Sequence, residues 1–209
     1  KEFYPDIILM PTVGSRPSMW QECSCKRRES AGRFVFPTFF EEDFEAAMVK
    51  TMGRYRWELC RFLQGGSWNN IKYRSLTSEY CDYLQFYKKN HDLSEEKKEK
   101  LKLQIQKGKN NSREVFVIDY ELWVRNESSG AIRLNKTARD ILAMYCPFSK
   151  PVRAKLSGQP MFEEAFAKPE RERAKSAHDL DLRIRQIKKE GKTEVPPEVE
   201  ETMRYYIEN

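Results

Sequence analysis

The segment of this 209-residue chain with the most reactive side chains contains two cysteines followed by four basic residues. They are Cys23, Cys25, Lys26, Arg27, Arg28 and Arg33. The Cys-x-Cys pair could bind a soft metal or act in redox chemistry, whereas the basic group could hold an anion. The other cysteines, histidines and basic residues of the chain distinguish these three chemistries.

The cysteines and histidines elsewhere in the sequence do not complete a metal site. A closed structural zinc site needs four ligands at ordered spacing, but the remaining cysteines stand singly at 60, 81 and 146, and neither histidine has a C-x-x-C partner. Thioredoxin-like redox pairs have two intervening residues rather than one. We therefore predict no metal and no cofactor. Because five cysteines cannot all pair, we expect a reduced protein in the cytoplasm.

The basic residues favour the anion hypothesis. Arg16 follows a Gly-Ser turn, and the basic group flanks Ser30 and Gly32, whose small size lets backbone N–H groups approach phosphate oxygens. A stripe on a predicted helix adds basic residues around an aromatic one at spacings of 4, 3 and 4. The predicted anion-binding residues are Arg16, Lys26, Arg27, Arg28, Arg33, Lys50, Arg54, Trp57 and Arg61. The alternative, a solvated surface that binds nothing, stays open.

The sequence offers little for catalysis. It contains no G-x-x-x-x-G-K-[ST], G-x-G-x-x-G, G-x-S-x-G or H-E-x-x-H motif. The acidic run 41–45 is explained by the start of a helix. Asp119 and Glu121 could form a buried acid pair, but pairing of one of them with an arginine such as Arg125 is the simpler interpretation. We predict no catalytic residues and expect no enzyme activity in this piece alone.

The pattern of apolar residues predicts the elements that position these side chains. Three short strands are expected within 6–36, the last ended by Pro37. A helix capped by Thr38 should run to Leu63 and stop at Gly65-Gly66. Further helices are predicted at about 76–89, from a cap at Asp92 to about residue 107, and from 136 to 145 after a cap at Asn135. Segment 114–125 fits a strand or a helix. We choose the helix because its neighbours are helical, and Asn111-x-x-Glu114 resembles a helix cap.

The C-terminal part differs from the body in composition. Segment 158–168 resembles a linker, and 169–190 should form a long charged helix with a narrow apolar stripe. We predict that this stripe binds a partner, either another copy or another region of a longer chain, through Ala177, Leu180, Ile184 and Ile187. A last amphipathic helix should follow Pro196-Pro197.

These patterns predict a mainly α (α+β) protein. The predicted body, 1–157, has a β-rich lobe at 1–37 and a bundle of about five helices at 38–157, followed by a linker and helical arm at 158–209. The net charge of +6 permits phosphate or nucleic-acid binding without requiring it. We expect a non-catalytic interaction or regulatory module from a longer cytoplasmic protein, with no membrane partner. The alternatives are a nucleotide- or nucleic-acid-binding module and a subdomain of an enzyme whose catalytic residues lie elsewhere.

Overall fold

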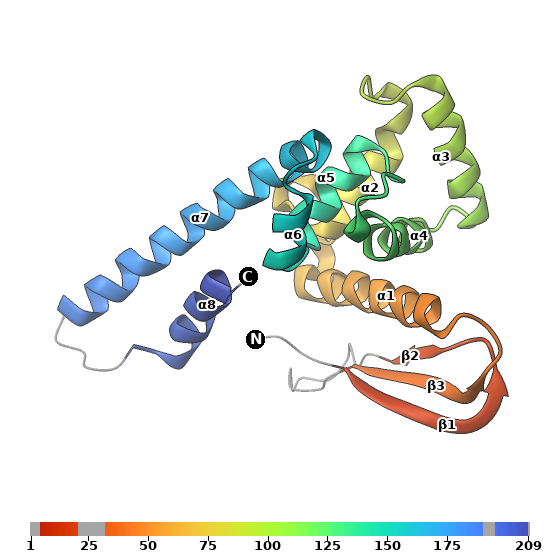
Figure 1. Cartoon of the computed structure of the whole chain (residues 1–209), viewed down its shortest axis with the longest axis horizontal. Helices are drawn as coiled ribbons and strands as arrows, with labels where there is room; N and C mark the ends of the chain where they lie inside the picture. Colours follow the sequence, from red (N-terminus) through yellow and green to blue (C-terminus); the bar gives the residue numbers. More distant parts are fainter. Residues whose placement is uncertain (1–4, 21–31, 190–194, 209) are drawn as a thin grey trace. The chain divides into compact units, whose positions relative to one another are not determined.

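The computed structural model describes residues 5–20, 32–189 and 195–208. The chain divides into two compact units, Glu2–Tyr145 and Cys146–Asn209, whereas the predicted division fell after residue 157. Figure 1 shows a small sheet followed by helices, so the predicted fold class, mainly α with a small β-rich N-terminal lobe, is confirmed. No helix in the described ranges combines the length and the apolar character needed to cross a membrane.

The N-terminal sheet contains the three predicted strands in the order β1-β3-β2. They are β1 (Asp6–Gly14), β2 (Ser18–Trp20) and β3 (Arg33–Phe40). β1 pairs with β3 in parallel, and β2 pairs with β3 in antiparallel orientation. The prediction that Pro37 ends the third strand is wrong. Pro37 pairs with Met10 where the register shifts, a position at which a strand tolerates a residue without an N–H.

Helix α1 (Phe44–Gln64) packs on one face of this sheet. Phe34 and Phe36 of β3 are fully buried there with Tyr55 of α1. The predicted cap at Thr38 is wrong, because Thr38 belongs to β3 and its hydroxyl donates to the carbonyl of Met10 at 2.7 Å. Asp43 caps the helix instead and accepts from the N–H of Ala46 at 3.1 Å. The helix ends at Gly65, as predicted, where φ is 55°.

The ambiguous segment is a helix, α4 (Ser112–Arg125), which confirms the choice made from its neighbours. Its buried side chains, Val115, Phe116, Tyr120 and Trp123 among them, follow the helical period rather than the alternation of a strand. α4 packs against α1, and Gly53 of α1 allows the close approach. A Cβ atom there would lie 2.9 Å from the Tyr120 ring.

Three further helices complete the first unit: α2 (Leu76–Phe86), α3 (Glu95–Lys107) and α5 (Lys136–Tyr145). The predicted cap at Asn135 is confirmed, since its side chain accepts from the N–H of Ala138 at 3.0 Å. The predicted cap at Asp92 is wrong, because the Ser94 hydroxyl accepts from the N–H of Lys97. Ser94 stands one residue before the helix, the position from which a side chain reaches these N–H groups.

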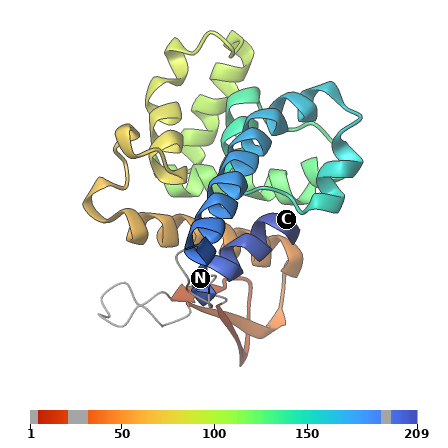
Figure 2. The same ribbon diagram turned by 90° about the vertical axis from the view of Figure 1, so that its left-hand side faces the viewer.

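The second unit contains α6 (Lys150–Leu156), α7 (Pro160–Lys189) and α8 (Pro197–Glu208). The predicted linker is wrong, because α7 begins at Pro160 and continues through Pro169. Phe162, Ala165 and Phe166 recur at helical spacing and are buried, which stabilises helix across a segment whose prolines indicate a break. Figure 2 shows α7 and α8 side by side, and the two helices are in contact.

Candidate functional site

The structure separates the predicted anion-binding residues. Lys26, Arg27 and Arg28, with the Cys-x-Cys pair, lie outside the described residues. Arg33 is exposed at the start of β3, whereas Arg16 is exposed in the turn between β1 and β2, toward the other end of the strand. The four residues of the helical stripe all lie on α1. Nothing described brings Arg16 and Arg33 to the stripe.

Two basic residues of the stripe face carboxylates of α4. The Lys50 ammonium lies 3.2 Å from Glu121, and the Arg54 guanidinium donates to Glu114 at 2.9 Å. Glu121 also accepts from Arg125 at 3.3 Å, which confirms the pairing expected for that arginine. These ion pairs connect α1 to α4, so this half of the stripe holds two helices together.

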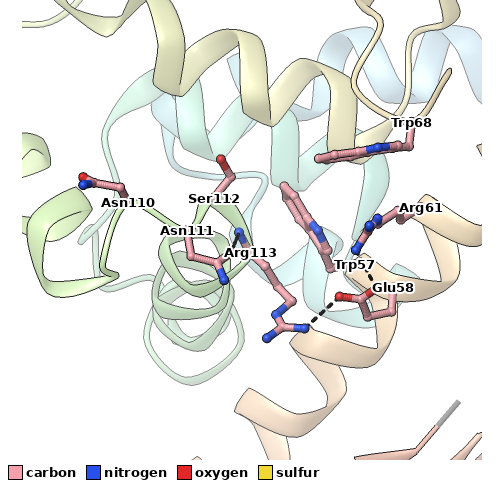
Figure 3. Close-up of a pocket in the computed structure, with 8 residues that line it drawn as sticks. All are labelled: Trp57, Glu58, Arg61, Trp68, Asn110, Asn111, Ser112 and Arg113. Carbon is pink, nitrogen blue, oxygen red and sulfur yellow. Dashed lines mark hydrogen bonds and ion pairs between the residues drawn. The ribbon is translucent and has the colours of Figure 1, made fainter. Parts of the chain in front are cut away.

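The other half of the stripe lines a pocket of about 410 Å³, a volume within the range of small-molecule sites. Figure 3 shows side chains from α1, from the turn that follows it, and from the start of α4 converging there. The residues that line the pocket are Trp57, Glu58, Arg61, Trp68, Asn110, Asn111, Ser112 and Arg113. Trp57 and Arg61 were predicted, and the rest are new.

Two guanidinium groups bracket one carboxylate in this pocket. Glu58 accepts from Arg113 at 2.8 Å and lies 3.6 Å from Arg61 (Figure 3). Arg113 also donates to Glu114 at 3.0 Å. Burial lowers the pKa of Arg113, but its hydrogen bonds to Glu58 and Glu114 outweigh that effect and raise it. The lining therefore carries two positive charges and one negative charge.

The aromatic wall of the pocket consists of two tryptophans. Trp57 is buried, and its ring centroid lies 6.4 Å from that of Trp68 in an edge-to-face arrangement. The guanidinium carbon of Arg61 lies 5.1 Å from the centroid of the Trp68 ring, within the range of a cation–π contact. This contact leaves the Arg61 side chain 52% exposed, so its N–H groups remain accessible to a ligand.

The start of α4 forms the opposite wall. Lys109 and Asn110 both have positive φ, 53° and 56°, which turns the chain sharply before the helix. The Asn111 side chain then accepts from the N–H of Arg113 at 3.0 Å, confirming the predicted cap. The Ser112 hydroxyl is hydrogen-bonded to the Cys81 thiol. Burial raises the pKa of this thiol, and the hydrogen bond offsets only part of that rise. The cap and the turn fix Arg113 in position beside Glu58.

The other acidic residue singled out from the sequence, Asp119, is buried inside the helical bundle. It accepts from the Tyr80 hydroxyl at 2.5 Å and from Gln104 at 2.7 Å. Burial raises its pKa to about 6, although both hydrogen bonds act in the opposite direction. Because both carboxylate oxygens are engaged and the residue is 3% exposed, Asp119 is placed to hold helices together.

The predicted partner-binding stripe lies on α7. Ala177, Leu180, Ile184 and Ile187 are all half-buried. α8 of the same unit contacts α7 and contributes a buried Val199. Partner binding through the stripe stays a prediction. Across the ranges that the structure describes, no group of three or more His, Cys, Asp or Glu side chains could hold a metal ion.

The sequence could not reveal the pocket as a whole. Trp57 and Arg61 were found because they share one face of a helix. Trp68 follows the predicted helix stop at Gly65-Gly66 and was not among the predicted site residues. Arg113 was missed because it meets Glu58 across 55 residues of chain. The available signal was the Asn111 cap, which places a helix start, with Arg113 in its first turn, but no local pattern says which helix lies opposite.

Comparison with known proteins places the chain in a family without assigning it an activity. No curated protein and no solved structure matches it. Residues 65–205, more than half of the 209 residues, match a family model described as a domain of unknown function, DUF8509. The match begins just after α1, so it includes Trp68 and Arg113 of the pocket but not Trp57, Glu58 or Arg61. The chain therefore belongs to the DUF8509 family.

Proposed function

We propose that this chain is a non-catalytic binding module whose pocket between α1 and α4 takes a small anionic ligand with a flat ring, such as a nucleotide. The observation that carries the proposal is the convergence of Arg61 and Arg113 beside Trp68 in a pocket of about 410 Å³. Guanidinium groups suit phosphate oxygens, and an indole ring suits the face of a base.

The ion pairs of the stripe favour a small ligand over a nucleic-acid strand. A strand tracks a continuous row of unpaired cations. Here Lys50 and Arg54 are each within 3.2 Å of a carboxylate of α4, so the exposed positive charge of the stripe is concentrated at Arg61. A ligand confined to the pocket can use Arg61 and Arg113 without breaking the Lys50–Glu121 and Arg54–Glu114 ion pairs between α1 and α4.

The chemistry of the lining suits binding rather than catalysis. It offers guanidinium, indole and amide groups, and its one carboxylate, Glu58, is engaged by both arginines. A general base needs a carboxylate or imidazole that is able to accept a proton from the substrate. Glu58 instead orients the two arginines and limits the net positive charge of the pocket. A ligand phosphate would approach Arg61 from the exposed side.

The proposal is tested by titrating the protein with ATP, AMP and inorganic phosphate while following tryptophan fluorescence. Trp57 and Trp68 line the site, so a bound base should quench their emission. Arg61→Gln should weaken ATP binding about 10- to 100-fold, the usual effect of losing a hydrogen bond to a charged group.

Arg185→Gln is the matched control. Arg185 is also exposed and also pairs within its own helix, with Asp181 at 2.8 Å, but it lies on α7. ATP affinity should be unchanged in this variant. If none of the three probes alters the fluorescence, or if Arg61→Gln and Arg185→Gln bind ATP equally well, the proposed function is wrong.

A further inference from the structure

Strand β1 has an open edge and an apolar surface. It pairs with β3 on one side, and no strand among the described residues lies on its other side. Every residue from Asp6 to Val13 is exposed, including five large apolar side chains: Ile7, Ile8, Leu9, Met10 and Val13. Natural proteins usually protect such an edge with charge or a covering segment. Between Ile7 and Gly14 this strand has no charged residue.

The hydrogen bonds of β1 show which backbone groups are available. The N–H of Asp6 donates to the carbonyl of Gly32 at 2.8 Å, so Asp6 faces β3. Because alternate residues of a strand point their backbone groups to opposite sides, Ile8 and Met10 also face β3, whereas Ile7 and Leu9 point their N–H and C=O groups outward. Pro5 and Pro11 flank this pair and lack an N–H.

We propose that a second copy of this chain pairs with β1 edge to edge, in antiparallel orientation, about a two-fold axis at Ile8. In this register Ile7 of each copy lies opposite Leu9 of the other, and each pair exchanges both of its backbone hydrogen bonds. This register also sets Pro5 of one copy opposite Pro11 of the other, so the missing donors fall outside the central pairs. In registers centred one residue to either side, Pro5 lies opposite Leu9 or Pro11 lies opposite Ile7, and the C=O group of that Leu9 or Ile7 is left without a donor.

The side chains suit a partner identical to this chain. The proposed register places apolar residues opposite each other from Ile7 to Leu9 and sets Asp6 opposite Met10, so the strand's one acidic residue does not meet its own copy. A two-fold axis normal to the sheet keeps both α1 helices on the same face. Ile7 and Leu9 share that face with Phe34 and Phe36, their neighbours in the β1–β3 register. In each copy, the buried apolar residues Phe34, Phe36 and Tyr55 are therefore continued by Ile7 and Leu9 toward the two-fold axis.

The exposed area is enough for a weak self-association. Between Pro5 and Pro11, the stretch that the proposed register pairs, four large apolar side chains per copy are exposed: Ile7, Ile8, Leu9 and Met10. At roughly 100 Å² each, they supply about half of the roughly 800 Å² per partner of a standard interface, which is the size range of weak complexes. Symmetric pairing of one surface patch is also the commonest way in which identical chains assemble.

The test is sedimentation velocity of the wild type and of Leu9→Lys over a wide range of concentration. The wild type should form dimers as its concentration rises, and Leu9→Lys should raise the dissociation constant at least tenfold, because it places two like charges at the shared edge. The matched control is Leu63→Lys on α1, which is equally exposed at 67% against 60% for Leu9. It should leave the dimer unchanged.

A cross-linking experiment tests the register itself, in a Cys23→Ser, Cys25→Ser background. The two Ile8 residues would face each other as a non-hydrogen-bonded pair with Cα atoms about 4.5 Å apart, a distance that a disulfide spans. Ile8→Cys should therefore form a cross-linked dimer on mild oxidation. Ile7→Cys should not, because the two Ile7 Cα atoms would lie more than about 7 Å apart.

A wild type that stays monomeric at every concentration overturns the proposal. So does a dimer that Leu9→Lys leaves intact, or one that Ile7→Cys cross-links as readily as Ile8→Cys. The pocket plays no part in these measurements, since Leu9 and Ile8 lie on β1. The outcome is therefore independent of whether the module binds an anion.

Discussion

Substitution of the buried Asp119 by asparagine should change how the stability of the protein depends on pH. The pKa of Asp119 is raised from 3.8 to about 6, chiefly because burial disfavours the charged form. The folded state therefore binds a proton over a pH range in which the unfolded chain has already lost it. The stabilisation from this proton is fully present below pH 3.8 and disappears as the pH rises through about 6.

The size of the effect follows from the shift. One pKa unit corresponds to about 1.4 kcal/mol, so Asp119 should cost the wild type about 3 kcal/mol of unfolding free energy between about pH 4 and pH 7. Other carboxylates also titrate there, and Glu114, whose pKa is raised by burial but lowered overall by Arg54 and Arg113, acts in the opposite direction. The difference between wild type and Asp119→Asn cancels these shared contributions.

The assay is urea unfolding of both proteins at several pH values. Relative to Asp119→Asn, the wild type should lose about 3 kcal/mol as the pH rises from 4 to 7. Tyr80→Phe provides a second check, because it removes the hydroxyl that donates to the Asp119 carboxylate. The pKa of Asp119 should then rise further and the loss should extend to higher pH. A difference between wild type and Asp119→Asn that stays constant across this range would refute the reasoning.

Two other substitutions test the packing of the first unit. Arg139→Leu should lower the unfolding free energy by about 3–5 kcal/mol, because Glu127, which is fully buried and 2.7 Å from Arg139, loses its counter-charge. Adding Glu127→Gln to this variant should restore part of the lost stability in the same urea assay. If the double variant recovers no stability, this explanation is wrong. Gly53→Ala should destabilise by about 1–3 kcal/mol despite its better helix propensity, because the new Cβ meets the Tyr120 ring at 2.9 Å. Gly158→Ala, where nothing lies within 4 Å, is its control in thermal unfolding, and equal melting temperatures for the two variants would count against a tight helix crossing.

The elements with strong local signals could be predicted from the sequence. The apolar spacing on α1 and its stop at Gly65, the caps at Asn111 and Asn135, and the helical identity of α4 were all predicted and confirmed. Each depends on contacts within about one turn of chain. Asp43 was missed as the cap of α1 because Thr38 also had the pattern of a cap. Only pairing with β1 decides that Thr38 belongs to a strand.

The errors and omissions concern long-range contacts. Pro160 and Pro169 predicted a linker, but burial of Phe162 and Phe166 outweighs the cost of a proline within the helix. The basic stripe on α1 was visible, yet its division into ion pairs and a pocket depends on α4. The α4 carboxylates lie 60 residues from Arg54 and 71 residues from Lys50 in the sequence. The spacing of basic residues along one helix does not predict which carboxylates of another helix will pair with them.

The most direct test of the proposed function is to follow the tryptophan indole N–H signals by NMR while ATP is added. The chain has four tryptophans, Trp20, Trp57, Trp68 and Trp123, which single substitutions to phenylalanine would assign. Binding in the pocket predicts that the signals of Trp57 and Trp68 shift together and saturate with ATP, while those of Trp20 and Trp123 stay in place. Saturable shifts confined to Trp20, or no shift of any indole signal, would contradict an anion-binding pocket between α1 and α4.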